Sequence, residues 1–309
     1  MRTIPGLESY PSDAGPCIVA LGAFDGIHLG HRAILGTAVA RGRARGDRVV
    51  ACTFDRHPME ILSPARAPAP LTTLDERLHL IAETGVDPTL VLAFTAELAG
   101  IEPEAFVRDI IVGRLHAQEV VVGDNHTFGR AARGNAALLS AVGAPMGLVT
   151  YVVPPRLVDG VVVSSSEIRT VLREGDVVRA ARYLGRPYSI AGRVTHGDGR
   201  GRTLGFPTAN LDHERPLLVP TGVYACRAQV DGGTHQAVVN VGVRPTFGDN
   251  ALAIEAHLMD TAADLYGRVL QLHFMARLRG ERKFAGVDEL RAQIARDVVA
   301  ARRELAPAV

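Results

Sequence analysis

His28 and His31 lie three residues apart in the segment Gly22–His31, which reads GAFDGIHLGH. The apolar run Cys17–Leu21 precedes this segment and an apolar-periodic stretch, Ala33–Val39, follows it. The pattern predicts a strand, a tight glycine turn, and a helix that begins near the two histidines. Free amide groups and the helix dipole at such a turn attract phosphate. Two imidazoles on the first helical turn can both face this phosphate and donate hydrogen bonds to the charge that builds up during phosphoryl displacement.

The same two histidines have two simpler interpretations. They could be ordinary residues at a helix start, satisfied by local hydrogen bonds. They could also bind a metal, but Cys52 and His57, the nearest further candidates, lack the spacing that makes a zinc site persuasive. The position directly after a strand and a glycine turn favours phosphate handling over both alternatives.

A second phosphate element is predicted at SSSEIR, where Ser164 to Ser166 are followed by Glu167 and Arg169. Serine at this place is also an ordinary helix N-cap, and Glu167 could complete a capping box with Ser164. In this chain, HLGH would form one half of a clamp around a triphosphate. Hydroxyls at a helix start with an arginine one turn later favour the interpretation that SSSEIR forms the other half.

The C-terminal half contains a dense cluster, Gly192–Asn210, which reads GRVTHGDGRGRTLGFPTAN. Its glycines and its two closely spaced arginines suit a phosphate loop, although the GxxxxGK[ST] pattern is absent. A barrel hairpin with a glycine turn is the simpler alternative. The hydroxyl of Thr208 and the amide of Asn210 favour the phosphate loop, since together they could hold Mg²⁺ and a nucleotide phosphate.

Two further residues are out of character with their surroundings. Glu255 lies in the middle of a predicted strand, IEAHL, where it is either an outward-facing solvated residue or a base for a substrate hydroxyl. Lys283 is the only lysine among 34 basic residues, which marks its ammonium group as a candidate for a specific role.

Length and composition describe an ordinary globular protein. A chain of 309 residues predicts two domains, and 47% hydrophobic with 22% charged residues is typical of the globular class. No apolar run approaches the roughly 18 residues of a membrane span, and the N-terminus lacks the apolar region of a secretory signal.

Three scattered cysteines suit the reduced cytoplasm. A net charge of +1 gives no reason to expect nucleic-acid binding. Small-molecule partners are therefore expected, and the sequence leaves open whether the chain forms a homo-oligomer.

The hydrophobic pattern predicts an α/β domain followed by a small barrel. Apolar runs and helical patterns alternate in the first half, which favours a parallel sheet with helices on both faces. The expected strands are Cys17–Leu21, Val49–Phe54, Leu90–Phe94, Val120–Gly123 and Leu148–Val153. The expected helices are Ala33–Arg41, Leu74–Glu83, Pro103–Leu115 and Ala136–Val142, with a two-piece helix at Ser164–Leu184.

After Gly185 the pattern changes to short strands and glycine-rich turns, which suggests a barrel. The expected strands are Tyr188–Thr195, Gly222–Val230, Gln236–Val243, Ala253–Leu258 and Leu270–Ala276. A helix closes the chain, with Leu290, Ile294 and Val298 repeating every four residues. The predicted domains are therefore residues 1–185 and 186–309.

The whole chain resembles the bacterial bifunctional riboflavin kinase/FAD synthetases. GAFDGIHLGH, TFDRHP, VVGDNHTFG and SSSEIR occur in the family's order in the first half, and HGDGRGRTLGFPTANL, NVGVRPTFGD, IEAHL, DLYG and RGERKF occur in the second. The resemblance implies a Rossmann-like nucleotidyltransferase domain and a six-stranded antiparallel flavokinase barrel with a terminal helix. It also implies phosphorylation of riboflavin by Mg²⁺–ATP to FMN, then adenylylation of FMN by a second ATP to FAD and pyrophosphate.

Site residues follow from the resemblance by position. Glu255 is implied as the base for the ribityl 5′-hydroxyl, and His28 and His31 as the groups that stabilise the transition state at the ATP α-phosphate. The implied adenylyltransferase pocket consists of Gly22, Phe24, Asp25, Gly30, Asn125, Ser164, Ser165 and Arg169. The implied kinase pocket consists of Gly197, Gly201, Arg202, Phe206, Pro207, Thr208, Asn210, Arg279 and Lys283, with Thr208 and Asn210 as the Mg²⁺ ligands.

Three positions depart from the family's pattern. Arg56 stands where proline is usual, His126 where phenylalanine is usual, and Ser166 where threonine is usual. None of these removes a residue implied to act on phosphorus. A kinase with a silent or differently specific first domain, and a non-enzymatic flavin- or nucleotide-binding regulator, are the alternatives to the two-step enzyme.

Overall fold

A computed structural model describes residues 2–197, 200–243, 252–261 and 263–307 of the chain. The chain divides into two compact units, residues 1–165 and 166–309, and each is described by itself. The predicted boundary at residue 186 stays a prediction. Part of the NVGVRPTFGD motif, residues 244–249, and residues 198–199 of the glycine-rich cluster lie outside the described residues.

The first unit is built on a six-stranded sheet in which all neighbouring strands are parallel. Its order is β1-β4-β3-β2-β5-β8. The strands are β1 (Thr3–Pro5), β2 (Cys17–Leu21), β3 (Arg48–Phe54), β4 (Thr89–Leu92), β5 (Ala117–Gly123) and β8 (Val149–Val153). Two short hairpins accompany the sheet, β6 (Thr127–Phe128) with β7 (Gly134–Asn135), and β9 (Leu157–Val158) with β10 (Val161–Val162).

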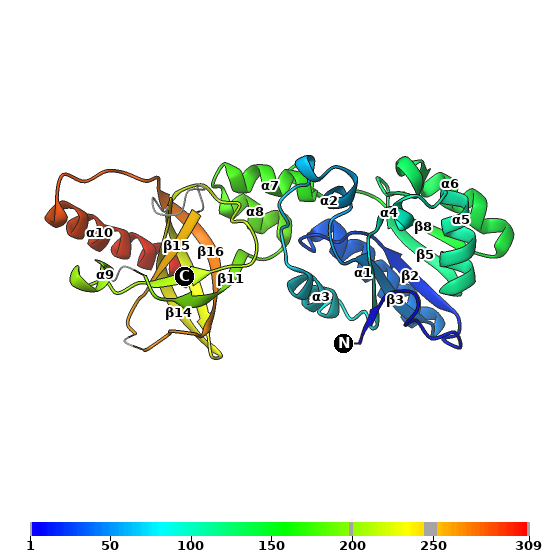
Figure 1. The fold of residues 1–309 in the computed structure, drawn as a ribbon, viewed down its shortest axis with the longest axis horizontal. Coiled ribbons are helices and arrows are strands. Elements are labelled where there is room, and N and C mark those ends of the chain that lie inside the picture. Colours follow the sequence, from blue (N-terminus) through cyan, green and yellow to red (C-terminus); the bar gives the residue numbers. More distant parts are fainter. Residues whose placement is uncertain (1, 198–199, 244–251, 262, 308–309) are drawn as a thin grey trace. The chain divides into compact units, whose positions relative to one another are not determined.

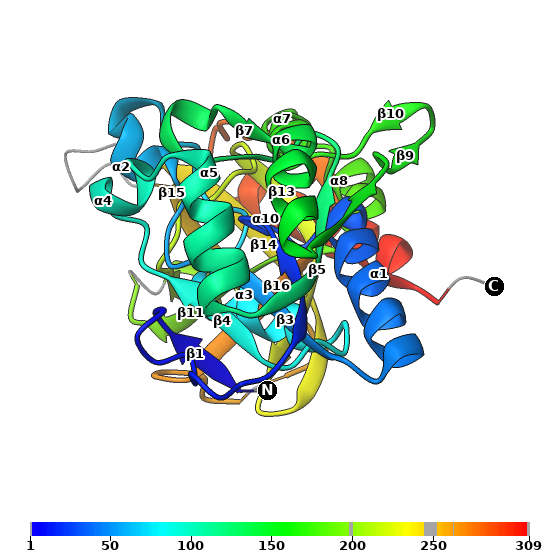
Figure 2. The same cartoon turned by 90° about the vertical axis from the view of Figure 1, so that its right-hand side faces the viewer.

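Helices cover both faces of this sheet, as the alternation of strands and helices predicted. They are α1 (Leu29–Arg45), α2 (Met59–Leu62), α3 (Leu74–Ala82), α4 (Ala96–Ala99), α5 (Pro103–Ala105) with a π-helical continuation (Phe106–Arg114), and α6 (Ala136–Gly143). Single 3₁₀ turns lie at Pro64–Arg66, Arg130–Ala132 and Ala144–Met146. Figure 2 shows α1 and α5 on opposite sides of the strands.

The side chains of β2 pack alternately on the two faces of the sheet. Ile18 and Ala20 pack against α1 and α3, whereas Val19 and Leu21 pack against the helix that follows α5. All five residues of β2 are buried, which explains why the strand is a continuous apolar run in the sequence. The strands expected in this half are confirmed to within three residues at each end. The short strand β1 was not predicted, because three residues with a proline carry no period.

The second unit contains a closed barrel (Figure 1). Its strand order is β11-β12-β15-β14-β13-β16. All of its neighbouring strands are antiparallel. The strands are β11 (Tyr188–Thr195), β12 (Ala209–Asp212), β13 (Gly222–Val230), β14 (Gly233–Val243), β15 (Leu252–Leu258) and β16 (Val269–Arg279). The hydrophobic pattern alone located five of the six, and it missed β12, whose four residues follow directly on the FPT turn. The predicted six-stranded antiparallel barrel is confirmed.

The described residues of this part of the chain form four helices: α7 (Ser165–Arg173), α8 (Val177–Leu184), α9 (Arg200–Thr203) and α10 (Val287–Leu305). The predicted break between the first two falls at Gly175, whose φ of +83° lies in the left-handed region that favours glycine. The terminal helix α10 packs on β13, β14 and β16 through Ala301 and Leu305. Its buried face also includes Gln293 and Asp297, two polar residues that an apolar repeat cannot reveal.

Two global properties complete the description. Within the described ranges, no helix is long and apolar enough to cross a membrane. Cys17, Cys52 and Cys226 are all buried free thiols.

Candidate active sites

The first site lies where the strand order of the parallel sheet reverses. The chain runs from β2 outward through β3 and β4, then returns to place β5 on the other side of β2. In open α/β sheets, ligands bind outside the carboxyl ends of the strands at such a switch point. The Gly22–His31 loop leaves β2 there, and Asn125 follows β5 two residues after Gly123. A Cβ on Gly123 would lie 3.3 Å from the Ile34 side chain of α1 and 3.4 Å from the Asn125 amide oxygen, so the two segments meet closely.

His28 caps the helix that follows this loop. Its Nδ1 accepts hydrogen bonds from the backbone N–H groups of Gly30, at 3.1 Å, and His31, at 3.3 Å. An Nδ1 that accepts two hydrogen bonds carries no proton, so the neutral ring holds its proton on Nε2. The cap therefore fixes both the orientation of the buried His28 ring and the tautomer that presents an N–H donor.

His31 stacks on His28 with ring centroids 3.6 Å apart, and the edge of Phe24 packs against it. Burial holds the pKa of His31 well below its usual range, and the neighbouring His28 and Arg77 lower it further. Within the described part of the chain, its buried Nδ1 has no hydrogen-bond partner. Because His31 is neutral at physiological pH, the stacked rings can approach closely without charge repulsion.

Arg77 is a residue of this site that the sequence interpretation missed. Its guanidinium is buried and donates from Nη1 to the carbonyl oxygens of Ala23 and Phe54, both at 2.9 Å. Desolvation lowers the pKa of Arg77 but leaves it cationic. A buried positive charge beneath the loop raises the local electrostatic potential where an anionic ligand would bind. The sequence offered one indication of this role, since Arg77 occupies an inward position of α3 between Leu74 and Leu80.

The loop between β2 and α1 is rigid because its own residues fix it. Asp25 is buried, and its carboxylate accepts hydrogen bonds from the backbone of Leu71 and Thr72. Phe24 has a positive φ of 53° and is fully buried. A Cβ on Gly22 would lie 3.0 Å from the Phe24 ring. Asp25 and Phe24 thus shape the loop, while the two histidines supply its polar chemistry.

The SSSEIR segment reaches the same loop through one of its serines. The Ser165 hydroxyl donates to the carbonyl oxygen of Asp25 at 2.9 Å. A Cβ on Gly30 would lie 3.0 Å from the His28 ring and 3.7 Å from the carbonyl oxygen of Val163, just before the serines. Ser164 is partly buried at the start of α7. Arg169 is buried within α7, 4% exposed.

His126 lies in the turn after β5, and its ring stacks on Phe128 with centroids 5.8 Å apart. Desolvation lowers its pKa to about 4, and its buried Nε2 has no partner within the described ranges. The imidazole thus occupies a site that suits an uncharged ring. This fits the family's usual phenylalanine at the same position.

Replacing His126 with phenylalanine is expected to stabilise the protein in acid. In the native state the pKa of His126 is lowered to about 4, whereas in the unfolded chain the imidazole has its ordinary pKa of 6.5. Stability is therefore lost as the pH falls from 6.5 towards 4, by about 1.4 kcal/mol per pH unit for one histidine. Urea unfolding across this range should show a smaller loss for His126→Phe than for the wild type. His79→Gln, which removes an exposed histidine, is the matched control.

The second site lies on a row of side chains that crosses the barrel. The strand register places Glu255 of β15 directly opposite Asn210 of β12 on one side and Asn240 of β14 on the other. Directly opposed side chains on one face have Cβ atoms about 4.5–5.5 Å apart. The predicted metal ligand Asn210 and the predicted base Glu255 are therefore neighbours. No ion pair to Glu255 exists among the described residues.

The glycine-rich segment closes over the same row. A Cβ on Gly197 would lie 2.1 Å from the Asn210 amide nitrogen, and a Cβ on Gly201 would lie 3.0 Å from the Thr208 hydroxyl. A Cβ on Gly201 would also lie 2.4 Å from the carbonyl oxygen of Phe206, so only glycine permits the approach of the backbone there, which is how a loop brings its N–H groups to a phosphate. Arg202 is in α9 of this loop. The predicted cluster of Gly197, Gly201, Thr208 and Asn210 is thus a contiguous piece of structure.

His257 fixes the turn that carries Thr208 and was not singled out in the sequence. Its Nδ1 lies 2.8 Å from the carbonyl oxygen of Pro207, and its ring packs edge-on against Phe206 at 5.5 Å. His257 follows Glu255 by two residues in β15, so both side chains lie on one face. The alternation in IEAHL was the available signal, since two polar residues share one face of an otherwise apolar strand.

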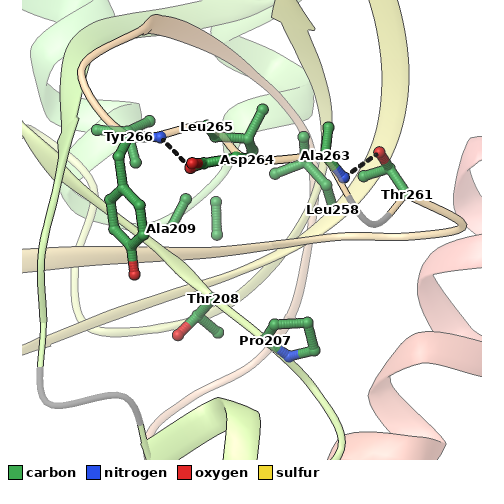
Figure 3. Close-up of a pocket in the computed structure, with 11 residues that line it drawn as sticks. Pro207, Thr208, Ala209, Leu258, Thr261, Ala263, Asp264, Leu265 and Tyr266 are labelled. Carbon is green, nitrogen blue, oxygen red and sulfur yellow. Dashed lines mark hydrogen bonds between the residues drawn. The ribbon is translucent and has the colours of Figure 1, made fainter.

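A cavity of about 430 Å³ adjoins Thr208 at the end of the barrel. Figure 3 shows Thr208 and Pro207 along one side of it, with Tyr266, Leu258 and Ala209 among the side chains around it. The His196 ring stacks on Tyr266 with centroids 3.8 Å apart. A mostly apolar cavity with an aromatic pair at its edge suits a flat heterocycle, with the Thr208 hydroxyl beside it.

Arg279 of the RGERKF segment forms an ion pair with Asp297 of α10. Its guanidinium donates to both carboxylate oxygens of Asp297 in α10, at 2.7–3.1 Å. Gln293 donates a further hydrogen bond to Asp297 at 2.7 Å, which explains why two polar residues lie on the buried face of α10. Arg279 thus fastens α10 to the barrel. Lys283 lies exposed on the segment between β16 and α10.

Asp297→Asn is expected to lower the free energy of unfolding by about 3 kcal/mol, because it leaves a largely buried guanidinium without its counter-charge. Asp260→Asn is the matched control, since Asp260 pairs with Arg302 of the same helix but both side chains are exposed. It should lower the free energy of unfolding far less, because solvent screens this exposed pair. Urea denaturation of the two variants measures the difference, and equal losses would contradict the structural role assigned to the Arg279 pair.

A parallel sheet with paired histidines at its switch point, followed by a barrel in which Asn210 and Glu255 pair across two strands beside Thr208, indicates the class of two-domain nucleotide-dependent transferases. Comparison with known families agrees: residues 10–167 match the family described as FAD synthetase, and residues 184–305 match the family described as riboflavin kinase. The chain belongs to the family of bifunctional riboflavin kinase/FMN adenylyltransferases, and the resemblance inferred from its motifs is confirmed.

The similarity to known members covers nearly the full length. The chain is 38% identical over 303 residues to the bifunctional riboflavin kinase/FMN adenylyltransferase of Escherichia coli, with 98% of this chain and 96% of that protein covered. It is 37% identical over 290 residues to the Bacillus subtilis protein of the same name, with 91% and 90% covered. Among solved structures, one described as a macrolide-efflux protein from Streptococcus pneumoniae has a TM-score of 0.90 and 29% identity, over 97% of this chain and 98% of that one.

Proposed function

We propose that this chain makes FAD from riboflavin in two steps at two separate sites. The barrel phosphorylates the riboflavin 5′-hydroxyl with ATP to give FMN, and the N-terminal unit transfers an adenylyl group from a second ATP to FMN, releasing pyrophosphate. The observation that carries the proposal is the direct opposition of Asn210 and Glu255, beside Thr208, in a chain whose other unit holds the stacked His28 and His31. Three free thiols support a reducing compartment, the cytoplasm.

In the kinase step, Glu255 accepts the proton of the 5′-hydroxyl as its oxygen attacks the γ-phosphate. Glu255 suits this role because the carboxylate is held between two neutral amides and has no cationic partner among the described side chains. The cavity beside Thr208 is proposed to hold the adenine ring of ATP, and the glycine loop over Thr208 and Asn210 is proposed to hold its phosphates. Positioning and charge neutralisation carry the transfer, with no covalent enzyme intermediate.

The residues present fit Mg²⁺. Thr208 and Asn210 offer oxygen ligands two residues apart, and Mg²⁺ in phosphoryl-transfer sites is held by few protein ligands together with substrate phosphates. The described residues hold no cluster of three or more His, Cys, Asp or Glu side chains that would form a metal cage. When bound, Mg²⁺ would neutralise charge on the transferring phosphate.

In the adenylyl step, the FMN phosphate attacks the α-phosphate of ATP. His28 donates from Nε2 to the charge that develops there, since its Nδ1 is occupied by the cap of α1. His31, stacked against it and neutral, is proposed as the second donor, and the buried Arg77 adds a fixed positive potential. Asn125, Ser164, Ser165 and Arg169 are proposed to position the nucleotide, with Ser165 already tied to the loop.

Incubation of the purified protein with riboflavin, ATP and Mg²⁺, followed by chromatography of the flavins, tests the proposal. FMN should appear first and FAD should follow, and EDTA should stop FMN formation until Mg²⁺ is restored. No FMN or FAD would contradict the proposal in favour of a binding protein, and FMN alone would mean that the first unit is silent.

A further inference from the structure

Asn240 of β14 has no role in the reaction as described so far, yet it lies directly opposite Glu255. Its other cross-strand neighbour is Val223 of β13. Val223 and Val238 pack against the terminal helix α10, on the outside of the barrel. Since residues of one strand alternate between faces and opposed residues share a face, Asn240, Glu255 and Asn210 all lie on this outer face.

On the side of Glu255 that faces Asn210 lies Gly197 of the glycine-rich segment, which is proposed to bind the phosphates. The backbone at Gly197 approaches so closely that a Cβ there would lie 2.1 Å from the Asn210 amide nitrogen. When a substrate hydroxyl reaches Glu255, the phosphate that is transferred to it therefore lies on the Asn210 side of Glu255. The rest of that substrate must leave on the opposite side, past Asn240.

Asn240 is bordered by a second carboxylate on that opposite side. A Cβ on Gly242, the next residue of β14 on the same face, would lie 3.4 Å from the Asn240 amide nitrogen and 3.0 Å from the Glu281 carboxylate. The lack of a side chain at Gly242 leaves this space to Glu281, which belongs to the segment between β16 and α10. The amide of Asn240 thus lies between two acidic side chains, Glu255 and Glu281.

We propose that Asn240 determines the specificity of the kinase for a polyol chain, by binding the hydroxyl next to the one that is phosphorylated. This inference rests on the proposed function. With the 5′-hydroxyl at Glu255, the 4′-hydroxyl on the adjacent carbon reaches the neighbouring side chain in the row. A primary amide both donates and accepts, which suits a hydroxyl group, and Glu281 provides an acceptor for a hydroxyl further along the chain.

The test compares riboflavin with a flavin analogue whose N10 chain is 5-hydroxypentyl, which keeps the reacting hydroxyl but lacks the other three. The wild type should phosphorylate riboflavin with a higher kcat/KM than the analogue. In Asn240→Ala, kcat/KM for riboflavin should fall about tenfold, while kcat/KM for the analogue should hardly change. Gln236→Ala, an amide on the same face of β14 but four residues away, is the matched control and should keep the full preference.

Equal losses with both substrates would show a purely structural role and overturn the inference. If Asn240→Ala does not fold, Asn240→Ser, which is polar but too short to reach the substrate, must lose the preference as well. A folded serine variant that keeps the preference would equally overturn the inference. A wild type that forms no FMN from riboflavin would overturn the proposed function itself, which separates that failure from a loss of discrimination.

Discussion

Replacing His28 with serine is expected to lower the rate of FAD formation from FMN about 10²–10³-fold, while riboflavin phosphorylation continues unchanged. That range is the usual effect of removing one donor that stabilises a developing oxyanion. Serine keeps an acceptor for the N–H groups at the start of α1, which His28 Nδ1 now satisfies. It removes the Nε2–H donor together with the ring that stacks on His31. Separate assays with riboflavin and with added FMN measure the two steps.

His28→Ala serves as the comparison that separates the two roles of the ring. It should lower the rate of FAD formation to the same degree but also lower stability by about 0.5–2 kcal/mol, because α1 loses its cap. Loss of both activities in a folded His28→Ser protein would contradict the separation of the two sites. Full FAD synthesis by that variant would show that the Nε2–H donor does not act on the α-phosphate.

Replacing Glu255 with glutamine is expected to lower FMN formation by about 10²–10⁴-fold, the range for loss of a general base. The neutral amide keeps the size and cross-strand position of Glu255 beside Asn210. Added FMN should still be converted to FAD at the wild-type rate, since His28 and His31 lie in the other compact unit. Steady-state assays with riboflavin and with FMN measure the two effects.

Glu304→Gln provides the control for this variant, because Glu304 is an exposed glutamate of α10. It should leave both reactions unchanged. Kinase turnover that persists in Glu255→Gln would mean that another group accepts the 5′-hydroxyl proton, and the assignment of the base would be wrong.

Local patterns in the sequence were sufficient for most of the fold. Continuous apolar runs such as Cys17–Leu21 located the buried parallel strands, because a strand covered on both faces needs no polar alternation. The pattern could not find β12, since four residues after the FPT turn are too few for a period. It could not place Gln293 and Asp297 on the buried face of α10 either, because their burial depends on Arg279, which is distant in the sequence.

In the candidate sites too, local patterns identified some residues and missed those that depend on distant parts of the chain. The histidines and the Thr-Asn pair were found because their types and short spacing carry the chemistry. Asn240 and Arg77 were missed, since each belongs to its site through the tertiary arrangement alone. Asn240 joins the second site only through the register of β14 and β15, and Arg77 joins the first only when α3 packs beneath the loop.

Mixing the two single-site variants tests most directly whether two independent sites act in series. His28→Ser should convert riboflavin to FMN with almost no FAD, and Glu255→Gln should form almost no FMN from riboflavin. An equimolar mixture supplied with riboflavin, ATP and Mg²⁺ should form FAD, because FMN made by the intact barrel of one protein is a substrate for the intact first unit of the other. Chromatography of the mixture should show FMN rising before FAD. A mixture of the two folded proteins that forms no FAD, although His28→Ser alone forms FMN and Glu255→Gln converts added FMN, would contradict two sites linked by free FMN.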